Sequence, residues 1–195
     1  MLQPPDTHSS PGAALIALGS NLSFQQNTPR ALLQQALEKM EQKGLSILRI
    51  SAFYSTPCFP AGTGPDYVNA VALIHTKMTA QKLLSHLHEV ENALGRQRLG
   101  RWQARVIDLD LLAYDQQILP DQKTFDHWQQ LPLEKQKQIA PQELILPHPR
   151  IQDRAFVLVP LAEIAPDWTH PVFGKTARQL RDELDPADIA QVNLL

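Results

Sequence analysis

Two aspartates set into an apolar run are the residues of this sequence best suited to chemistry. Asp108 and Asp110 alternate with Ile107, Leu109 and Leu111. In a β-strand, residues i and i+2 point to the same face about 6 to 7 Å apart, so the two carboxylates would stand side by side. Neighbouring carboxylates in an apolar setting repel each other unless a cation compensates their charge. The pair therefore predicts a cation site, and its oxygen ligands favour Mg²⁺.

An arginine-rich segment leads directly into the two aspartates. Its charged and aromatic members are Arg96, Arg98, Arg101, Trp102 and Arg105. Guanidinium groups bind phosphate oxygens in a bidentate manner, and Mg²⁺ held by one or two carboxylates completes its coordination with water and substrate phosphates. Gly95 and Gly100 give the segment conformational freedom. These residues predict a phosphate site beside the metal, and the alternative is a solvated loop before an edge strand whose aspartates face water.

Length and composition place this chain among globular proteins. Its 195 residues are 43% hydrophobic and 19% charged, which suits one domain with a sizeable core. A net charge of -2 disfavours a general nucleic-acid binder. No apolar run is long enough to span a membrane, and residues 1–12 are polar without a signal-peptide core. We therefore expect a disordered leader over residues 1–12, a single domain over residues 13–195, and a cytoplasmic protein.

A single cysteine limits the chemistry further. Cys58 has no second cysteine with which to form an intrachain disulfide or a cysteine-based zinc site. It lies in Thr56-Pro57-Cys58-Phe59, with no base nearby in the sequence to activate it as a nucleophile. We expect a partly buried thiol without a catalytic role.

Hydrophobic periodicity and turn residues divide the first part of the chain into alternating elements. The expected elements are a strand at 13–18 ended by a turn at 19–21, a helix at 28–44, a strand at 45–55, a loop at 56–66, a strand at 67–76, a helix at 79–95 and a strand at 106–112. This β-α-β-β-α-β order is the pattern of ferredoxin-like α+β folds. That fold supports enzymes and RNA-binding modules alike, so it does not decide the function.

The second part of the chain adds elements to this core. Residues 115–143 are polar and are predicted to form an insertion with one short helix near 133–139. A proline-punctuated segment at 144–150 precedes an apolar helix at 153–164, which Pro166 ends. An amphipathic helix follows around 176–184. The expected fold class is thus α+β, with a ferredoxin-like core, extra C-terminal helices and the 115–143 insertion.

Several short motifs follow one another in a specific order. They are Leu18-Gly-Ser-Asn21-Leu, Ser55-Thr-Pro57, Pro65-Asp-Tyr67-Val-Asn69-Ala, Gly95-Arg96, Arg101-Trp102, Arg105-Val-Ile-Asp108-Leu-Asp110, Pro147-His148-Pro149-Arg150 and Arg154-Ala-Phe156. Together they resemble the 6-hydroxymethyl-7,8-dihydropterin pyrophosphokinase family of folate biosynthesis, over about residues 13–175. The resemblance implies a Mg²⁺-dependent diphosphotransferase that moves the β,γ-pyrophosphoryl unit of ATP to the pterin hydroxymethyl group, with release of AMP and use of two Mg²⁺ ions.

The resemblance also implies a role for individual residues. The implied catalytic residues are Arg96, Arg105, Asp108 and Asp110, with the two aspartates as metal ligands. The implied ATP-binding residues are Glu91, Arg98, Trp102, His148 and Arg154. The implied pterin-binding residues are Thr56, Pro57, Phe59, Tyr67, Asn69 and Phe156, of which Tyr67 and Phe156 would sandwich the ring.

Other functions share some of these features. An RNA-binding module would use arginines and aromatics on a sheet, but the sequence has neither the aromatic RNA-binding motif nor a basic net charge. A Mg²⁺-dependent nuclease or phosphohydrolase would also use paired aspartates and arginines, and a relative that binds without catalysing is a further alternative. No GxxxxGK[ST] loop indicates a Walker-type ATPase. We expect a monofunctional enzyme whose partners are ATP and the pterin, without nucleic acid or membrane, as a monomer or a weak homodimer.

Overall fold

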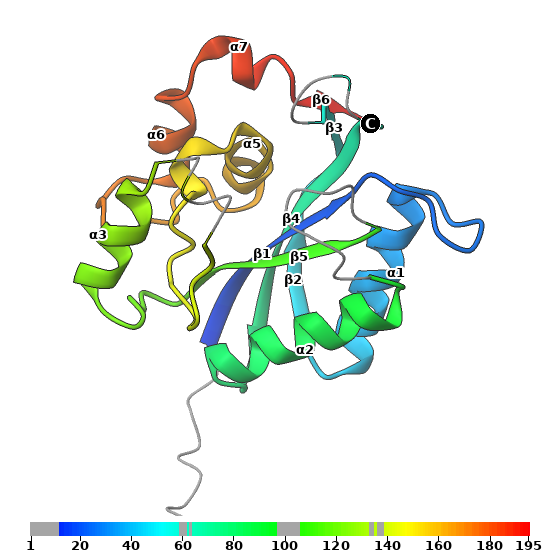
Figure 1. The fold of residues 1–195 in the computed structure, drawn as a ribbon, viewed down its shortest axis with the longest axis horizontal. Coiled ribbons are helices and arrows are strands. Elements are labelled where there is room, and N and C mark those ends of the chain that lie inside the picture. The colour runs from blue at the N-terminus through cyan, green and yellow to red at the C-terminus, as the bar shows by residue number, and fades with distance from the viewer. Residues whose placement is uncertain (1–11, 59–61, 63, 97–105, 133–134, 136–138) are drawn as a thin grey trace, which may run out of the picture.

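The computed structural model describes residues 12–58, 62, 64–96, 106–132, 135 and 139–195. It is a mixed fold of helices and one antiparallel sheet (Figure 1). The strands are β1 (Gly12–Ser20), β2 (Ser46–Ile50), β3 (Tyr54–Thr56), β4 (Tyr67–Thr76), β5 (Asp108–Tyr114) and β6 (Asn193–Leu194). The helices are α1 (Pro29–Gln42), α2 (Ala80–Ala93), α3 (Gln122–Gln130), the short 3-10 helix η1 (Ile151–Asp153), α5 (Ala155–Ile164), α6 (Ala177–Asp182) and α7 (Pro186–Ile189).

The two long strands β1 and β4 form the centre of the sheet. β1 pairs with β4 on one side and with β5 on the other, and both pairings are antiparallel. β4 also pairs with β2 through its last residues and with β3 through its first, and β6 extends β3. The strand order is therefore β5-β1-β4-β3-β6, with β2 as a second neighbour of β4.

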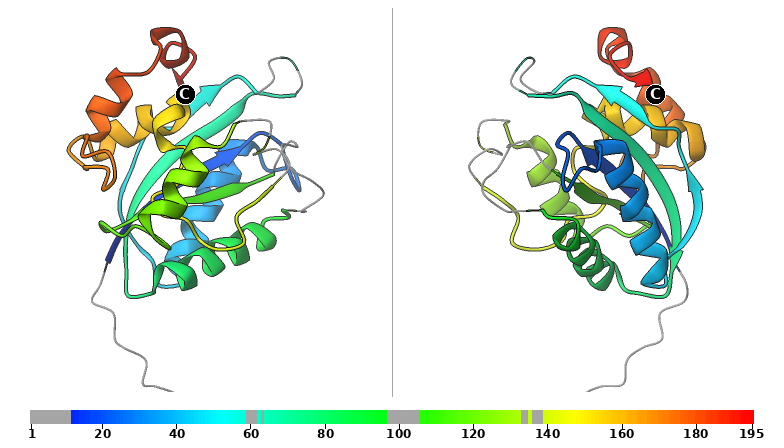
Figure 2. Two further views of the ribbon diagram at one scale, coloured as in Figure 1. Left: turned by 60° about the vertical axis from the view of Figure 1, so that its left-hand side comes forward. Right: turned by 90° about the vertical axis from the view of Figure 1, so that its right-hand side faces the viewer.

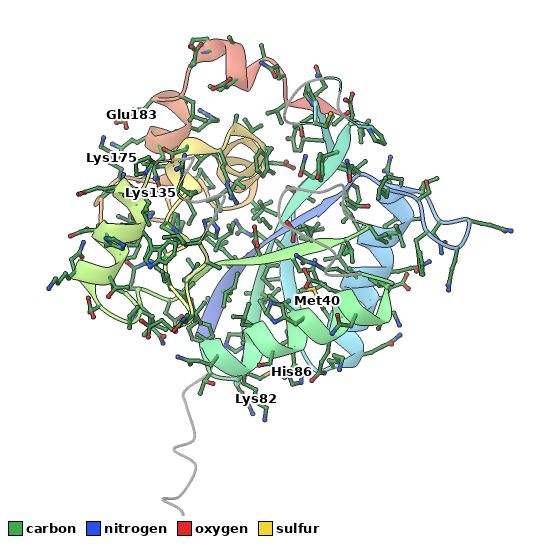
Figure 3. All side chains as sticks on the ribbon, viewed as in Figure 1. Met40, Lys82, His86, Lys135, Lys175 and Glu183 are labelled. Carbon is green, nitrogen blue, oxygen red and sulfur yellow. The ribbon has the colours of Figure 1, made fainter. Side chains whose placement is uncertain are left out.

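Each face of the sheet carries its own hydrophobic core. On one face, Ile16 and Leu18 pack in a core that also holds Met40 from α1 and Leu87 from α2; Met40 is labelled in Figure 3. On the other face, Leu15 belongs to a core with residues of α5 and α6. Figure 2 shows α1 and α2 on one side of the sheet and α5 and α6 on the opposite side. The alternation of β1 side chains between two cores fixes the strand register.

Capping residues explain where the first two helices begin. The Thr28 side chain accepts a hydrogen bond from the Ala31 N–H, and Pro29 occupies the first turn of α1. Thr79 accepts in the same way from the Lys82 N–H at the start of α2. Both helices were predicted from these residues and from the spacing of their apolar positions.

The first strand continues two residues beyond its predicted end. Gly19 and Ser20 were expected to turn the chain after residue 18, yet both belong to β1. Gly19 is paired with Asn69 on one side and with Asp108 on the other. Pairing on both sides outweighs the local preference of glycine and serine for turns, so this part of the prediction was wrong.

The segment 45–55 forms two strands rather than the single strand that was predicted. β2 ends at Ile50, where Ser51 still bonds to Val71 through its own N–H and its hydroxyl oxygen. The next N–H, of Ala52, instead donates to the carboxylate of Glu163 in α5 at 3.1 Å. The N–H of Ala52 therefore bonds to helix α5 and not to a neighbouring strand, and the strand is interrupted there. No local sequence pattern could reveal this contact.

The insertion contains a helix that the sequence analysis did not predict. α3 begins after Asp121, whose carboxylate accepts a hydrogen bond from the Thr124 N–H at 2.8 Å. The helix buries Phe125 against the rings of His170 and Phe173, with centroids 5.9 and 6.0 Å away. An aspartate cap followed by an aromatic residue was the signal for it. The predicted short helix at 133–139 falls mostly on residues outside the described part of the chain.

The two predicted C-terminal helices occur in the expected order, whereas η1, α7 and β6 were not predicted. The apolar helix expected at 153–164 is α5, and the amphipathic helix expected at 176–184 is α6, which a capping box at Thr176 and Gln179 opens. Within the described ranges, none of the helices combines the length and hydropathy needed to cross a bilayer. The expected leader lies outside the described residues except for Gly12, the first residue of β1, and the single domain over 13–195 stays a prediction.

Two phenylalanines at contrasting positions test this packing. Phe125→Ala should lower the free energy of unfolding by about 3 to 5 kcal/mol, because it leaves a cavity beside His170 and Phe173. Phe156→Ala should cost much less stability, because its side chain is 38% exposed. Urea unfolding followed by circular dichroism measures both, and equal losses for the two variants would contradict the placement of α3.

Candidate active site

Strand β5 presents the two aspartates on one face of the sheet. Asp108 and Asp110 are partly exposed, and Leu109 between them is buried in the core on the α1 and α2 side. This alternation confirms the strand and the shared face that the sequence predicted. Both carboxylates therefore point to the face that α5 covers further along the sheet.

A row of paired residues crosses the sheet from Asp108. Asp108 lies opposite Gly19 of β1, Gly19 lies opposite Asn69 of β4, and Asn69 lies opposite Tyr54 of β3. Directly paired residues project to the same face, so the Asp108 carboxylate and the buried Asn69 amide share one surface. A Cβ added at Gly19 would come 3.3 Å from the Asn69 Oδ1, closer than ordinary contact. Glycine at this place keeps the surface between the carboxylate and the amide open.

Arg96 links helix α2 to the first aspartate. One of its guanidinium nitrogens, Nη1, pairs with the Glu91 Oε1 and lies 2.8 Å from the Asp108 Oδ1. The same Glu91 oxygen accepts a hydrogen bond of 2.7 Å from the backbone N–H of Leu109. Glu91 thus ties the end of α2 to the strand between the two aspartates, and it holds Arg96 against Asp108.

Glu91 is a carboxylate in an unusual setting. Its side chain is fully buried, and its second oxygen, Oε2, has no hydrogen-bond partner among the described residues. Burial raises its pKa from 4.5 to about 7, opposed by the Arg96 charge and the Leu109 N–H and reinforced by Asp108 and Asp110. A buried carboxylate with a displaced pKa beside two more carboxylates is typical of a functional site.

A second arginine pairs with the second aspartate. Arg154, directly before α5, places its Nη1 3.4 Å from the Asp110 Oδ2. Its guanidinium carbon also lies 5.6 Å from the centre of the Phe156 ring, within range of a cation–π contact. The structure therefore brings the predicted phosphate residue Arg154 to the predicted metal ligand Asp110, and sets the predicted pterin residue Phe156 beside them.

His148 approaches the same charges in an uncharged form. Its backbone N–H donates to the Leu112 carbonyl at 2.7 Å, and its Nδ1 accepts from the Arg150 N–H at 3.1 Å. Burial, together with the Arg154 charge, lowers the His148 pKa to about 3, although Asp108 acts in the opposite direction. The imidazole is therefore neutral at pH 7, and an acceptor role for Nδ1 leaves the ring proton on Nε2 as a donor.

Three of the residues predicted to bind the pterin lie together in β3 and β4, around Asn69. Asn69 is buried and donates from its Nδ2 to the Thr56 Oγ1 at 2.8 Å. Tyr67 lies two residues before Asn69 in β4, on the same face, and is paired with Thr56. Pro57 follows the end of β3 and is exposed. The structure joins Asn69, Thr56 and Tyr67, and the sandwich of Tyr67 with Phe156 stays a prediction.

Four residues of the predicted site lie outside the described part of the chain. They are Phe59, Arg98, Trp102 and Arg105. Their predicted roles stay predictions.

The donor set suits Mg²⁺ better than a metal that needs a complete protein cage. Asp108 and Asp110 offer carboxylate oxygens on one face of β5, with side chains 21% and 37% exposed. In the described ranges, no group of three or more His, Cys, Asp or Glu residues could hold a metal ion. Mg²⁺ is commonly bound through one or two carboxylates while water and substrate phosphates fill the remaining positions. The two aspartates therefore fit this ion when a phosphate substrate supplies further oxygens.

Comparisons with known proteins place this chain in a family. Residues 15–166 match the family model of 7,8-dihydro-6-hydroxymethylpterin-pyrophosphokinase (HPPK). The chain belongs to this family. The family catalyses pyrophosphate transfer to hydroxymethyldihydropterin in folate biosynthesis, and its members are ATP-dependent transferases.

Individual relatives cover most of the chain. A 2-amino-4-hydroxy-6-hydroxymethyldihydropteridine pyrophosphokinase of Haemophilus influenzae is 38% identical over 81% of this chain and 84% of its own length. The protein of the same name from Methylorubrum extorquens is 36% identical over 92% of this chain and 98% of its own. These relatives confirm the resemblance inferred from the motifs.

A solved structure shares the fold at low sequence identity. A Plasmodium falciparum HPPK-DHPS triple mutant superposes with a TM-score of 0.65 at 15% identity, over 91% of this chain. The present chain spans only 45% of that protein. The likeness confirms a mixed fold with an antiparallel sheet and helices.

Sequence reasoning missed two contributions to the site. Gly19 was interpreted only as a turn residue, whereas it separates Asn69 from Asp108 on the sheet. Glu91 was predicted as an ATP contact, without its bonds to Arg96 and to the Leu109 N–H. The position of Glu91 five residues before Arg96, at the end of a predicted helix, was the available signal.

The pKa of Glu91 predicts a pH dependence of stability. Because its folded-state pKa is about 7 and its ordinary value is 4.5, its contribution to stability is present below pH 4.5 and lost as the pH rises through about 7. Glu91→Gln should remove this loss. The difference in unfolding free energy between variant and wild type should then grow by roughly 3 kcal/mol from pH 4.5 to 7.5.

Urea titrations at several pH values, in buffer containing a chelator, measure this difference. Glu89→Gln is the matched control, because Glu89 lies on the same helix but is exposed and its pKa is lowered by Lys43. Parallel profiles for Glu91→Gln and the wild type would show that folding does not displace the pKa of Glu91.

Proposed function

We propose that the residues around Asp108 and Asp110 transfer the β,γ-pyrophosphoryl unit of ATP to 6-hydroxymethyl-7,8-dihydropterin. A bond forms between the hydroxymethyl oxygen and the β-phosphorus, the bond from the β-phosphorus to the bridging oxygen of AMP breaks, and the hydroxyl proton is released. The observation that carries the proposal is the row from Asp108 through Gly19 to Asn69. The row brings a carboxylate and a buried amide to one surface, which supports a phosphate site beside a site for a heterocycle.

Asp108 and Asp110 are proposed to bind two Mg²⁺ ions together with the triphosphate. Bound Mg²⁺ neutralises phosphate charge and lowers the pKa of the attacking hydroxyl group. The protein contributes two carboxylates whose spacing is fixed by the strand, with Leu109 anchored in the core between them. Rigid support of this kind keeps reacting groups oriented during phosphoryl-type transfer, where positioning and charge neutralisation supply most of the catalysis.

The triphosphate is proposed to lie between the arginines and His148. Arg96 and Arg154 already converge on the aspartates from separate segments of the chain, and the neutral His148 offers a hydrogen-bond donor. Arg98, Trp102 and Arg105 complete this proposal from the segment that joins α2 to β5. Glu91 lies on the same side, and its buried contact with Arg96 supports a role in placing that guanidinium.

The pterin is proposed to lie over Asn69 between Tyr67 and Phe156. An amide both donates and accepts hydrogen bonds, which suits a ring whose rim presents both kinds of group. Thr56, Pro57 and Phe59 are proposed to contact the same rim. Phe156 is 38% exposed although it is a large aromatic residue, and this supports its assignment to a ligand surface.

The core is proposed to be ferredoxin-like. Its element order β1-α1-β2-β4-α2-β5 and its strand order β5-β1-β4-β2 support this assignment. The short strands β3 and β6 and the helices after β5 are additions to that core.

The reaction is tested by ³¹P NMR of the protein with ATP, Mg²⁺ and the dihydropterin. AMP and a pterin diphosphate should appear only in the complete mixture. Formation of ADP or inorganic phosphate would retain a metal–phosphate site and exclude pyrophosphoryl transfer. Folded protein without any turnover would point to a binding function.

Removal of either aspartate should abolish most of the turnover. Asp108→Ala and Asp110→Ala should each reduce kcat by roughly 100-fold or more, because each deletes part of the charge stabilisation of the transition state. Asp153→Ala is the matched control, since Asp153 pairs with Arg150 outside the row. Near-normal kcat for Asp108→Ala or Asp110→Ala, measured with purified folded protein, would exclude that residue as a metal ligand.

The aromatic wall is tested separately. Phe156→Ala should raise KM for the pterin by about 10- to 100-fold and leave KM for ATP nearly unchanged, because it removes one face of the ring site. Initial rates at varied concentrations of each substrate distinguish the two constants. An effect confined to the ATP constant would place Phe156 on the nucleotide instead.

A further inference from the structure

Each of the two candidate metal ligands is already paired with an arginine of the same chain. The Asp108 carboxylate lies 2.8 Å from the Arg96 guanidinium, and the Asp110 carboxylate lies 3.4 Å from that of Arg154. The two arginines come from distant segments, one directly after α2 and the other directly before α5. They are also the described arginines that the proposed function assigns to the triphosphate.

These ion pairs compete with a metal ion for the same oxygens. A guanidinium that lies against a carboxylate oxygen blocks the approach of a metal ion to that oxygen, and a divalent cation a few Å from an arginine is repelled by roughly twice the energy of a single charge pair. The carboxylates are only 21% and 37% exposed, so water screens this repulsion incompletely. Tight metal binding at this face therefore requires the arginines to move away from the aspartates.

Movement of the arginines needs a new acceptor. A guanidinium removed from a carboxylate loses its ion pair and, at Asp110, a charge-assisted hydrogen bond. Phosphate oxygens replace these interactions with matching geometry. A nucleotide triphosphate delivered with its metal ion supplies both exchange partners at once: cations for the aspartates and anionic oxygens for the arginines.

We propose that Arg96 and Arg154 act as resident counterions of Asp108 and Asp110, and that they exchange these carboxylates for phosphate oxygens when the metal–nucleotide complex binds. This rests on the proposed function for the identity of the nucleotide. The exchange makes metal affinity dependent on the nucleotide, because the free protein presents neutralised carboxylates. When no substrate is present, the two arginines balance the negative charge of the neighbouring aspartates.

Glu91 gives Arg96 a second attachment during this exchange. Its Oε1 holds the Arg96 Nη1 and is itself fixed by the Leu109 N–H. The contact with Asp108 is therefore the one that a metal ion must break, while Glu91 retains the guanidinium near the site. Arg154 has no described carboxylate partner other than Asp110, so the two arginines differ in how freely they leave.

Binding of Mn²⁺, as a paramagnetic substitute for Mg²⁺, tests the exchange without any turnover. Electron paramagnetic resonance measures the dissociation constant for the metal in nucleotide-free protein. Arg96→Met and Arg154→Met should each bind Mn²⁺ about tenfold more tightly than the wild type, because each removes the guanidinium that lies against one of the two aspartates. Arg150→Met is the matched control and should leave the constant unchanged, since Arg150 pairs with Asp153.

A second measurement separates exchange from simple repulsion. With saturating α,β-methylene-ATP, which is not cleaved between its α- and β-phosphorus, the effect should change sign. Arg96→Met should then bind Mn²⁺ more weakly than the wild type by about tenfold, because the phosphates lose their guanidinium partner. Tighter binding of Mn²⁺ by the variant both with and without the nucleotide analogue would show that Arg96 only repels the metal, and would overturn the proposal.

The variants also allow for the buried carboxylate. Arg96→Met leaves the buried Glu91 carboxylate without its arginine, which can destabilise the fold. The double variant Glu91→Gln/Arg96→Met avoids this unpaired buried charge. Arg154→Met does not affect Glu91. Unchanged Mn²⁺ affinity in both arginine variants, with normal wild-type turnover, would overturn the exchange and retain the proposed function. Tightened binding without pyrophosphoryl transfer by the wild type would retain the exchange and overturn that function.

Discussion

The pairing of β1 with a strand on each side is the constraint on which the site depends. Gly19 is fixed opposite both Asn69 and Asp108, so the register of two ladders sets the separation between the amide and the carboxylate. A slip of one residue would turn these side chains to the other face and drive apolar ones out of the core. Alternate residues of β1 pack in the two hydrophobic cores, and this packing maintains the register. The geometry of the candidate site and the stability of the fold are thus determined by the same contacts.

The second requirement is compensation of negative charge at the edge of the sheet. Asp108, Asp110 and Glu91 surround the start of β5, and three carboxylates so placed disfavour the folded state unless cations or protons balance them. The displaced pKa of Glu91 and the pairs with Arg96 and Arg154 provide that balance. The arginines that stabilise the free protein are therefore the groups that are available to a phosphate substrate.

The features that could be predicted from the sequence are those that depend on residues close together in the chain. The caps at Thr28 and Thr79, the apolar stripes of α1 and α2, and the alternation that aligned Asp108 with Asp110 were all readable from the sequence. The extension of β1, the break after Ile50 and the burial of Glu91 each depend on a distant partner: a neighbouring strand, a carboxylate of α5, and the edge of β5. The sequence contains these partners without showing that they meet.

The distribution of the candidate site over the fold suits the charge exchange that we propose for its arginines. The aspartates and Asn69 belong to strands with core residues on both sides, and they cannot shift without breaking the ladder. Arg96 and Arg154 follow or precede helices and reach the same face through long side chains with many rotamers. In the proposed mechanism, the strands thus fix the groups assigned to metal and pterin, and the long arginine side chains can move from carboxylate to phosphate.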